Sequence, residues 1–239
     1  MAELTSSRIR ALIEEGQSLC VLPVGATEQH GPHLPVGTDT LIATTLCQEA
    51  SARSGVPLLP TLWLSSSHAH TTAWPGTISL RPRDVIGLVV EIASWVAASG
   101  FAKLLVVNAH VGNAGVLKVA VDELRDAGGV RAGLINWYEL DEVRATVSAD
   151  AADWHANAAE TALLLHLRPE LVDREAIRDD PDRTRDLILS YTVRETSKEG
   201  QTGSPSSATA ADGARLFAAA AAALTDRFER ARAESPPSW

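Results

Sequence analysis

The sequence predicts an α/β protein, a three-layer α/β/α sandwich built around a mainly parallel central sheet. Short apolar runs alternate along the chain with longer stretches of helical length. This alternation is typical of parallel strands joined by helical crossovers. The apolar runs are also continuous, as expected for strands that are buried on both faces of a sheet.

Four short runs are predicted to be strands. The run SLCVLPV ends at Gly25, and the runs KLLVVN and RAGLINW are similarly short and rich in branched side chains. Such runs, bounded by glycine, proline or polar residues, favour strands over helices. The predicted strands are residues 18–24, 57–64, 103–108 and 131–137.

The longer stretches are predicted to be helices. Residues 82–99 illustrate the signals, because Pro82 lies in the first turn and Gly100 follows the end. Proline and glycine are favoured at these positions of helix termini. The predicted helices are residues 5–15, 38–53, 82–99, 113–127, 156–167 and 208–232.

A single domain is predicted over residues 1–239, because no long polar linker interrupts the first 170 residues. The length is sufficient for one large α/β domain. Residues 173–207 are polar and carry clusters of Arg and Asp. They are predicted to form an irregular excursion at the surface or at a subunit contact.

Composition excludes several classes of protein. The net charge of −9 argues against nucleic acid or an anionic membrane as a partner, since both require a basic face. No apolar run reaches the roughly 18 residues of a membrane span, and the N-terminus lacks the apolar core of a secretory signal. These features predict a cytoplasmic protein, in which Cys20 and Cys47 are buried thiols.

The segment GATEQHGPHLPVGTD at 25–39 carries the most distinctive chemistry. Glu28 and His30 are two residues apart and would point to the same side of an extended segment. Asp39 stands at a predicted helix start, where the helix dipole favours a carboxylate. Carboxylate oxygen and imidazole nitrogen are ligands of divalent cations. The segment therefore predicts a metal site in which Asp39 can bridge two ions.

A simpler interpretation makes Asp39 a helix cap within an ordinary polar loop. Histidines at other strand ends favour the metal site instead. His68 and His70 follow the second predicted strand, and His110 follows the third. Because ligands bind outside the carboxyl ends of parallel strands, His110 is expected to be a metal ligand or a catalytic group.

The segment DWHANAAETALLLHL at 153–167 supplies a further carboxylate and histidine. Glu160 lies within an otherwise apolar run, and a buried carboxylate costs several kcal/mol unless it is paired or bound to metal. Glu160 is therefore predicted to be a second ligand or to orient one. His155 is predicted to carry a proton to the leaving nitrogen, because histidine titrates near neutral pH.

The substrate pocket is expected to be lined by His70, Trp74 and Trp154. Ordinary loop packing is the alternative interpretation of each residue taken singly. The sequence contains no Gly-x-Ser-x-Gly elbow, phosphate loop or G-x-G-x-x-G motif. Serine hydrolases and nucleotide-dependent enzymes therefore have little support.

Taken together, these motifs resemble the creatininase family, also called creatinine amidohydrolases. The resemblance covers most of residues 20–165. NAHVGN stands where the family commonly has Asn-Gly-His-Gly-Gly-Asn, and HANAAET stands where it has His-Ala-Gly-x-x-Glu-Thr. The matching segments are GATEQHGPHLPVGTD at 25–39, PGTISL at 75–80, NAHVGN at 108–113 and HANAAET at 155–161.

The resemblance implies an α/β/α sandwich with a metal centre, often binuclear, that holds zinc, manganese or iron. It also implies an oligomer, often a hexamer. By position, Glu28 and His110 would bind one metal, His30 the second, and Asp39 would bridge the two. Creatininase itself carries a glutamate two residues after the motif histidine, where this chain has Gly112.

The resemblance also implies hydrolysis of a C–N bond. The predicted function is a metal-dependent amidohydrolase that cleaves an amide, cyclic amide or formamide in a small molecule, with one or two Zn²⁺, Mn²⁺ or Fe²⁺ ions. With Gly112 in place of the glutamate of creatininase itself, Glu160 becomes the expected replacement ligand. Two alternatives stay open: a metallopeptidase that trims a short precursor peptide, as in the mycofactocin pathway, and a non-catalytic metal-binding scaffold.

Overall fold

A parallel three-stranded sheet forms the centre of the computed structural model, which describes residues 1–70, 73–147, 155–184 and 186–237. The strands lie side by side in their sequence order and in register, so that Val24, Asn108 and Asn136 are aligned. All three strands therefore end at the same edge of the sheet. The strands are β1 (Leu19–Val24), β2 (Lys103–Asn108) and β3 (Arg131–Asn136).

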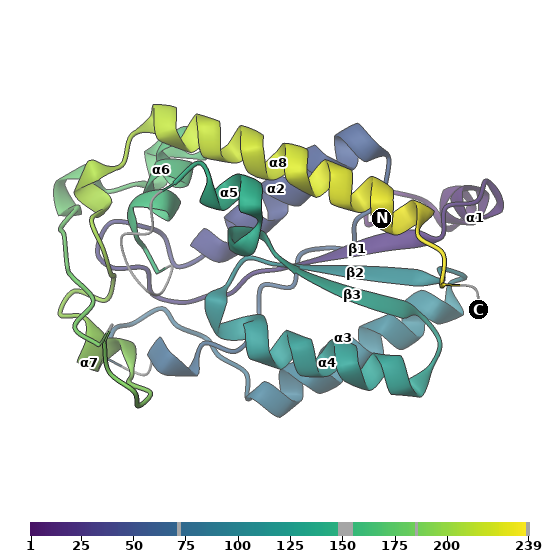
Figure 1. The fold of residues 1–239 in the computed structure, drawn as a ribbon, viewed down its shortest axis with the longest axis horizontal. Helices are drawn as coiled ribbons and strands as arrows, with labels where there is room; N and C mark the ends of the chain where they lie inside the picture. Colours follow the sequence, from purple (N-terminus) through teal and green to yellow (C-terminus); the bar gives the residue numbers. More distant parts are fainter. Residues whose placement is uncertain (71–72, 148–154, 185, 238–239) are drawn as a thin grey trace.

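Helices cover both faces of this sheet (Figure 1). One layer contains α2 (Thr38–Ser54), α6 (Ala158–Leu167) and α8 (Ala210–Ala233). The opposite layer contains α3 (Pro82–Ala98) and α4 (Ala114–Ala127). The predicted three-layer α/β/α sandwich is thus confirmed.

Residues of β1 alternate between the two apolar cores. Val21 packs into the core with α2, α6 and α8, whereas Cys20 and Leu22 pack into the core with α3 and α4. Burial on both faces explains why the strand sequences are continuously apolar. Cys20 and Cys47 are free and buried, as the sequence predicts.

Shorter elements complete the described part of the chain. They are α1 (Ser6–Glu14), α5 (Asp141–Arg144) and α7 (Val193–Thr196), with the 3-10 turns η1 (His68–His70), η2 (Val111–Asn113), η3 (Trp137–Glu139), η4 (Pro169–Leu171), η5 (Arg174–Ala176) and η6 (Pro205–Ser207). The six predicted helices each begin and end within two residues of the predicted positions. Within the described residues, no helix is both long and apolar enough to cross a membrane.

The prediction of a continuous strand at 57–64 is wrong. This segment lies along the free edge of β1 and makes only two isolated parallel bridges, Val21 with Leu58 and Val24 with Leu62. Pro57 and Pro60 interrupt the pairing, because proline has no N–H to donate to a neighbouring strand.

The segment 173–207 is only partly the surface excursion that its polar sequence predicts. Residues 200–203 are buried, whereas Ile188 is 99% exposed. Asp180 is the internal anchor of this segment. Its Oδ2 accepts hydrogen bonds from the Ser197 hydroxyl and from the backbone N–H groups of Lys198 and Glu199, at 2.9, 2.7 and 3.0 Å. Polar residues can therefore be buried here, because they satisfy one another.

Candidate metal centre

The loop between β1 and α2 brings Glu28 to Asp39. A Cβ atom at Gly25 would lie 2.5 Å from the backbone of Thr40, so glycine allows the strand end to pack directly against the first turn of α2. The Glu28 N–H donates to the Val36 carbonyl at 2.9 Å and closes the loop. Glu28 and Asp39 are both almost completely buried, at 0% and 2% exposure.

His110 follows β2, and Asn108 fixes its backbone. The Asn108 side chain accepts from the His110 N–H at 3.0 Å and donates to the His110 carbonyl at 2.8 Å. Asn113 ties this turn to the loop after β1, because its Nδ2 donates to the Gly25 carbonyl at 3.1 Å. The ends of two adjacent strands are therefore held together by buried amide side chains.

His155 and Glu160 enter the site from the start of α6. Asn157 caps the helix, since its Oδ1 accepts from the N–H groups of Ala159 and Glu160 at 3.1 Å each. Ala156 has a φ of 50°, an uncommon left-handed conformation for a residue with a side chain. Its N–H donates to Glu160 Oε2 at 2.5 Å. The strained turn thus directs both His155 and Glu160 inward.

Three histidines face one oxygen of Glu28. His110 Nδ1, His70 Nε2 and His155 Nδ1 lie 3.2, 3.3 and 3.4 Å from Glu28 Oε1. The sequence placed His70 in a substrate pocket, and the structure places it beside Glu28 as well. His70, His110 and His155 come from three different segments of the chain, and all three meet Glu28 at the carboxyl edge of the sheet.

Asp39 stands between two histidines. Its Oδ1 lies 3.3 Å from His30 Nε2, and its Oδ2 lies 3.3 Å from His110 Nδ1. The same nitrogen, His30 Nε2, also lies 4.0 Å from Glu160 Oε2. Each oxygen of Asp39 thus faces a different ring, which is the arrangement of a carboxylate that bridges two ions.

The spacing and hydrogen-bonding of these atoms fit metal ligands. Two ligand atoms about 2.1 Å from one ion and at a tetrahedral angle are separated by about 3.4 Å. An N–H···O hydrogen bond is shorter, at about 2.9 Å. Within the described part of the chain, Glu28 Oε2, His30 Nε2 and Asp39 Oδ2 are buried and have no hydrogen-bond partner. Buried polar atoms are rarely left in this state, so a cation is the partner they fit.

Three sets of side chains each bring three ligand atoms within 4.8 Å of one another. Two of these sets share Asp39, and two share Glu28. The sets are Glu28, Asp39 and His110; His30, Asp39 and Glu160; and Glu28, His70 and His155.

In His30 and His110, the ring nitrogen that points away from the carboxylates contacts a backbone carbonyl. The other, inner nitrogen of each ring faces the carboxylates and is free to bind metal. His30 Nδ1 lies 3.1 Å from the Glu28 carbonyl, and His110 Nε2 lies 3.1 Å from the Ser66 carbonyl. A carbonyl only accepts, so each of these nitrogens carries the ring hydrogen. The inner nitrogens, His30 Nε2 and His110 Nδ1, then present lone pairs, as histidine ligands do.

Electrostatics distinguish two sides of the cluster. Burial disfavours a charge on His30, but the Asp39 carboxylate raises the pKa of His30 to about 10. Burial raises the pKa of Glu160 to about 8, against the opposing effect of His30. Burial, reinforced by the neighbouring His155, lowers the pKa of His70 to about 3. The side around Asp39 therefore favours positive charge, which a divalent cation supplies, whereas the His70 side does not.

A small cavity opens beside the cluster. Its volume is about 270 Å³, and it is lined by Ser66, Ser67, His68, Ala69, His70, His110, Val111, Gly112, His155 and Val193. Trp74 is half-buried and is not among these lining residues. Trp154, the third residue predicted to bind substrate, lies outside the described residues.

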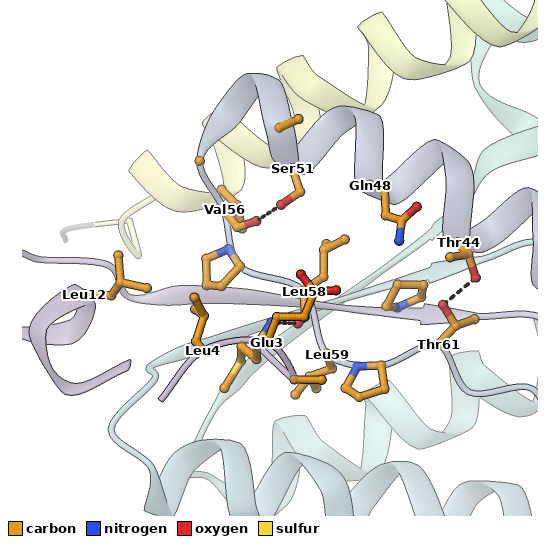
Figure 2. A pocket seen from close by; sticks show the side chains of 17 residues that line it. Glu3, Leu4, Leu12, Thr44, Gln48, Ser51, Val56, Leu58, Leu59 and Thr61 are labelled. Carbon is orange, nitrogen blue, oxygen red and sulfur yellow. Dashed lines mark hydrogen bonds between the residues drawn. The ribbon is translucent and has the colours of Figure 1, made fainter. Parts of the chain in front are cut away.

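A second cavity, of about 530 Å³, lies away from this cluster (Figure 2). It is formed between α2, the segment 57–61 and the N-terminal residues, and it contains no residue of the histidine and carboxylate cluster. The Thr44 and Thr61 hydroxyls join its walls at 2.7 Å. It offers no ligand set, so the smaller cavity is the candidate active site.

Gln29 is a buried residue of the site to which the sequence assigned no role. Its Nε2 lies 3.1 Å from His70 Nδ1 and 3.0 Å from His155 Nε2, and it donates to the Gly200 carbonyl at 2.7 Å. The only signal in the sequence is its position between two predicted ligands. The three partners of its Nε2 come from segments that are more than 40 residues away along the chain.

The sequence model of the creatininase family, described as creatinine amidohydrolase, matches residues 2–228. The chain belongs to the creatininase family. A mycofactocin precursor peptide peptidase of Mycobacterium tuberculosis (strain CDC 1551) is 35% identical over 232 residues, which cover 92% of this chain and 87% of the relative. A creatinine amidohydrolase of Pseudomonas putida is 29% identical and covers 77% of each chain.

The fold agrees with this family membership. The structure of a creatininase described as the Mn form superposes with a TM-score of 0.83 and 25% sequence identity, and it covers 96% of this chain and 97% of that chain. The creatininase fold thus extends over nearly the whole chain.

Gly112, where creatininase itself has a glutamate, lies directly beside the His110 ring. A Cβ atom at this position would lie 2.4 Å from His110 Nε2 and 3.1 Å from the Ser66 carbonyl. A side chain would therefore disrupt the contact that orients His110. Glu160, which the sequence predicts as the replacement carboxylate, approaches His30 from α6, with its Oε2 4.0 Å from His30 Nε2.

Proposed function

We propose that this creatininase-family protein is a metal-dependent amidohydrolase that holds two divalent ions. Glu28, Asp39 and His110 would bind one ion, and His30, Asp39 and Glu160 would bind the other. The observation that carries this proposal is Asp39, whose two oxygens face two different histidines at 3.3 Å each. Single-domain organisation over residues 1–239 is part of this proposal.

Bound ions of this kind polarise a carbonyl oxygen and lower the pKa of a bound water. The residues of the chain supply the remaining functions. Glu28 and Asp39 provide negative charge in a buried setting, where charge interactions are strong. His70 and His155 line the cavity beside these carboxylates, so they are the groups placed to contact a scissile amide.

For the substrate, we propose a short precursor peptide. The match to the precursor peptide peptidase, at 35% identity, is stronger than the match to the creatinine amidohydrolase, at 29%. Gly112, in place of the glutamate of creatininase, also separates this chain from creatinine hydrolysis. A small cyclic amide is the second candidate, because the cavity of about 270 Å³ is small.

The donor set narrows the choice of metal. Two imidazole nitrogens and three carboxylates suit Zn²⁺, Mn²⁺ or Fe²⁺. We propose zinc or manganese, and the Mn form of a creatininase with the same fold supports the latter. A purely structural, non-catalytic scaffold is less well supported, because His110, one of the proposed ligands, lines a cavity together with His70 and His155.

A homo-oligomer in the cytoplasm is also part of the proposal. The apolar side chains of Leu187, Ile188 and Leu189 are 54%, 99% and 73% exposed in the segment predicted to include a subunit contact. Exposed apolar patches of this kind favour burial against another chain.

Metal analysis combined with a substrate panel tests the proposed function. We expect the purified protein to hold close to two ions per chain and to cleave short peptides, with activity lost after chelation and restored by Zn²⁺ or Mn²⁺. Creatinine and small formamides serve as comparison substrates. Full activity in protein verified to be metal-free would overturn the metal requirement, and cleavage of cyclic amides alone would overturn the peptide assignment.

A further inference from the structure

The Gln29 side chain has one defined orientation. Its Oε1 accepts from the Gly31 N–H at 3.0 Å, and its Nε2 donates to the Gly200 carbonyl at 2.7 Å. A backbone N–H can only donate and a carbonyl can only accept, so the amide cannot be reversed without losing both hydrogen bonds. Gln29 is 3% exposed, so water cannot replace either partner at low cost.

This orientation determines which nitrogens of two histidines carry hydrogen. Gln29 Nε2 faces His70 Nδ1 at 3.1 Å and His155 Nε2 at 3.0 Å. The nitrogen of a side-chain amide is a donor and not an acceptor. It carries two hydrogens, and because one is donated to the Gly200 carbonyl, the two ring nitrogens share the other. Neither of these ring nitrogens can therefore carry a hydrogen, and in both rings the hydrogen lies on the other nitrogen. Those nitrogens, His70 Nε2 and His155 Nδ1, are the ones that face Glu28.

We propose that Gln29 is a positioning residue that makes His70 and His155 hydrogen-bond donors toward Glu28, and thereby keeps metal out of the set Glu28, His70 and His155. A ring nitrogen that carries hydrogen has no lone pair for a metal ion. The exclusion of metal from this set rests on the proposed function. The placement of the ring hydrogens rests on the contacts of Gln29 alone.

The proposal changes the expected role of His155. Its Nε2 faces an amide donor, so it has no path along which to accept and pass on a proton while Gln29 keeps this orientation. His155 Nδ1–H instead points toward Glu28 Oε1, 3.4 Å away, and so supports the carboxylate that the proposed function assigns to one metal ion. The proton shuttle that the sequence suggests is therefore replaced by a fixed donor.

Two glycines allow the segment 173–207 to pack closely against the loop that carries Gln29. Gly200 has a φ of 86°, and a Cβ atom there would lie 2.3 Å from Gln29 Oε1. Gly31 has a φ of 63°, and a Cβ atom there would lie 2.6 Å from Gln201 Oε1. The buried end of the segment 173–207 therefore packs directly on the Gln29 amide, which explains why this polar segment contains buried residues.

The variant Gln29→Glu tests the proposal. An oxygen would replace the amide nitrogen, and it would present a lone pair to both rings whether or not it also carries a hydrogen toward Gly200. We expect long-range ¹H–¹⁵N spectra of the metal-loaded protein to show hydrogen on His70 Nε2 and His155 Nδ1 in the wild type, and on His70 Nδ1 and His155 Nε2 in Gln29→Glu. In this variant, the two ring nitrogens that face Glu28 would carry lone pairs instead of hydrogens. The set Glu28, His70 and His155 could then bind a metal ion, and metal content would rise by about one ion per chain.

Gln201→Glu is the matched control. Gln201 is also a fully buried glutamine of the same region, and its Nε2 donates to the Arg178 carbonyl at 2.9 Å rather than to a histidine. We expect wild-type ring hydrogens and wild-type metal content in this variant. If Gln29→Glu does not fold, Gln29→Met removes the donor in a similar volume, and both hydrogen placements of His155 should then be populated.

Three results would overturn the proposal: hydrogen on His155 Nε2 in the wild type, unchanged ring hydrogens in Gln29→Glu, or an unchanged metal content once those hydrogens have reversed. The spectra do not depend on any substrate. The proposed function can therefore fail, through absence of hydrolysis, while the placement of the ring hydrogens is upheld, and the reverse can also occur.

Discussion

Two pairs of histidines in this site have similar burial and opposite surroundings. The outer nitrogens of His30 and His110 each face a backbone carbonyl, whereas the outer nitrogens of His70 and His155 both face the amide nitrogen of Gln29. All four inner nitrogens lie within 3.4 Å of a carboxylate oxygen.

The comparison shows that proximity to a carboxylate does not identify a metal ligand. All four rings meet that criterion, and Glu28, His70 and His155 are as closely spaced as the other two sets. The group behind each ring decides whether its inner nitrogen offers a lone pair or a hydrogen.

Removing one histidine from each pair should affect different properties: bound metal for the first pair and kcat for the second. We expect His110→Ala to lose tightly bound metal together with metal-dependent activity, because a ligand nitrogen is removed. We expect His155→Ala to keep wild-type metal content while kcat falls about 10–100-fold, the usual loss when a hydrogen-bond partner of a ligating carboxylate is removed. Metal analysis and steady-state kinetics on the same preparations measure both effects. Loss of metal from His155→Ala would make the two pairs equivalent and contradict the comparison.

A smaller effect is expected from Gly112→Ala. The added Cβ would lie 2.4 Å from His110 Nε2 and would displace the ring from the Ser66 carbonyl. Loss of such an orienting contact typically lowers metal affinity or activity about 10–100-fold. Competition with a metal-binding dye measures the affinity.

Gly115→Ala is the control for that substitution, because no atom lies within 4 Å of the position that its Cβ would take. We expect its metal affinity to equal that of the wild type. Equal affinities for Gly112→Ala and the wild type would show that the contact with the Ser66 carbonyl does not orient His110.

The smallest effect concerns acid pH and the segment that carries Gly200. Burial opposes the charge of Asp180, but hydrogen bonds from Glu199 N–H and Ser197, with Arg183 nearby, lower its pKa below the ordinary value. A lowered pKa in the folded state stabilises the fold above the unfolded-state pKa of about 3.9, and this stabilisation is lost as pH falls through the folded-state pKa. We expect amides 197–203 to exchange faster below about pH 4, before the amides of β2 do.

Hydrogen exchange followed by mass spectrometry measures this opening. In Asp180→Asn the charge is absent at every pH, so we expect the segment to exchange faster at neutral pH and with little further change on acidification. Because Gly200 orients Gln29, the His70 and His155 pair should be affected before the His30 and His110 pair. Simultaneous loss of protection over the whole chain would contradict a separately anchored segment.

Much of the fold could be predicted because its signals are local. Continuous apolar runs mark β1, β2 and β3, and proline and glycine mark the helix termini. The segment 57–64 is the exception, because its apolar composition resembles a strand while two prolines break the pairing. Whether an apolar segment pairs fully depends on its N–H donors as well as on its hydrophobicity.

The site residues were predictable by type and by position at strand ends. Glu28, His30, Asp39 and His110 each follow a strand or begin a helix in the sequence, and they lie together in the structure. The role of Gln29 was not predictable, because its partners come from η1, from the start of α6 and from Gly200. Nothing local to a glutamine indicates which distant rings it will contact.

The sequence by itself determined the α/β sandwich, the family and the residues proposed to bind metal, because these depend on local periodicity and on short motifs. Only the tertiary structure decided which rings present lone pairs and which present hydrogens. That choice depends on the backbone carbonyls of Glu28 and Ser66 and on the Gln29 amide. Donors and acceptors act over about 3 Å, so their effect exists only after distant segments have packed together.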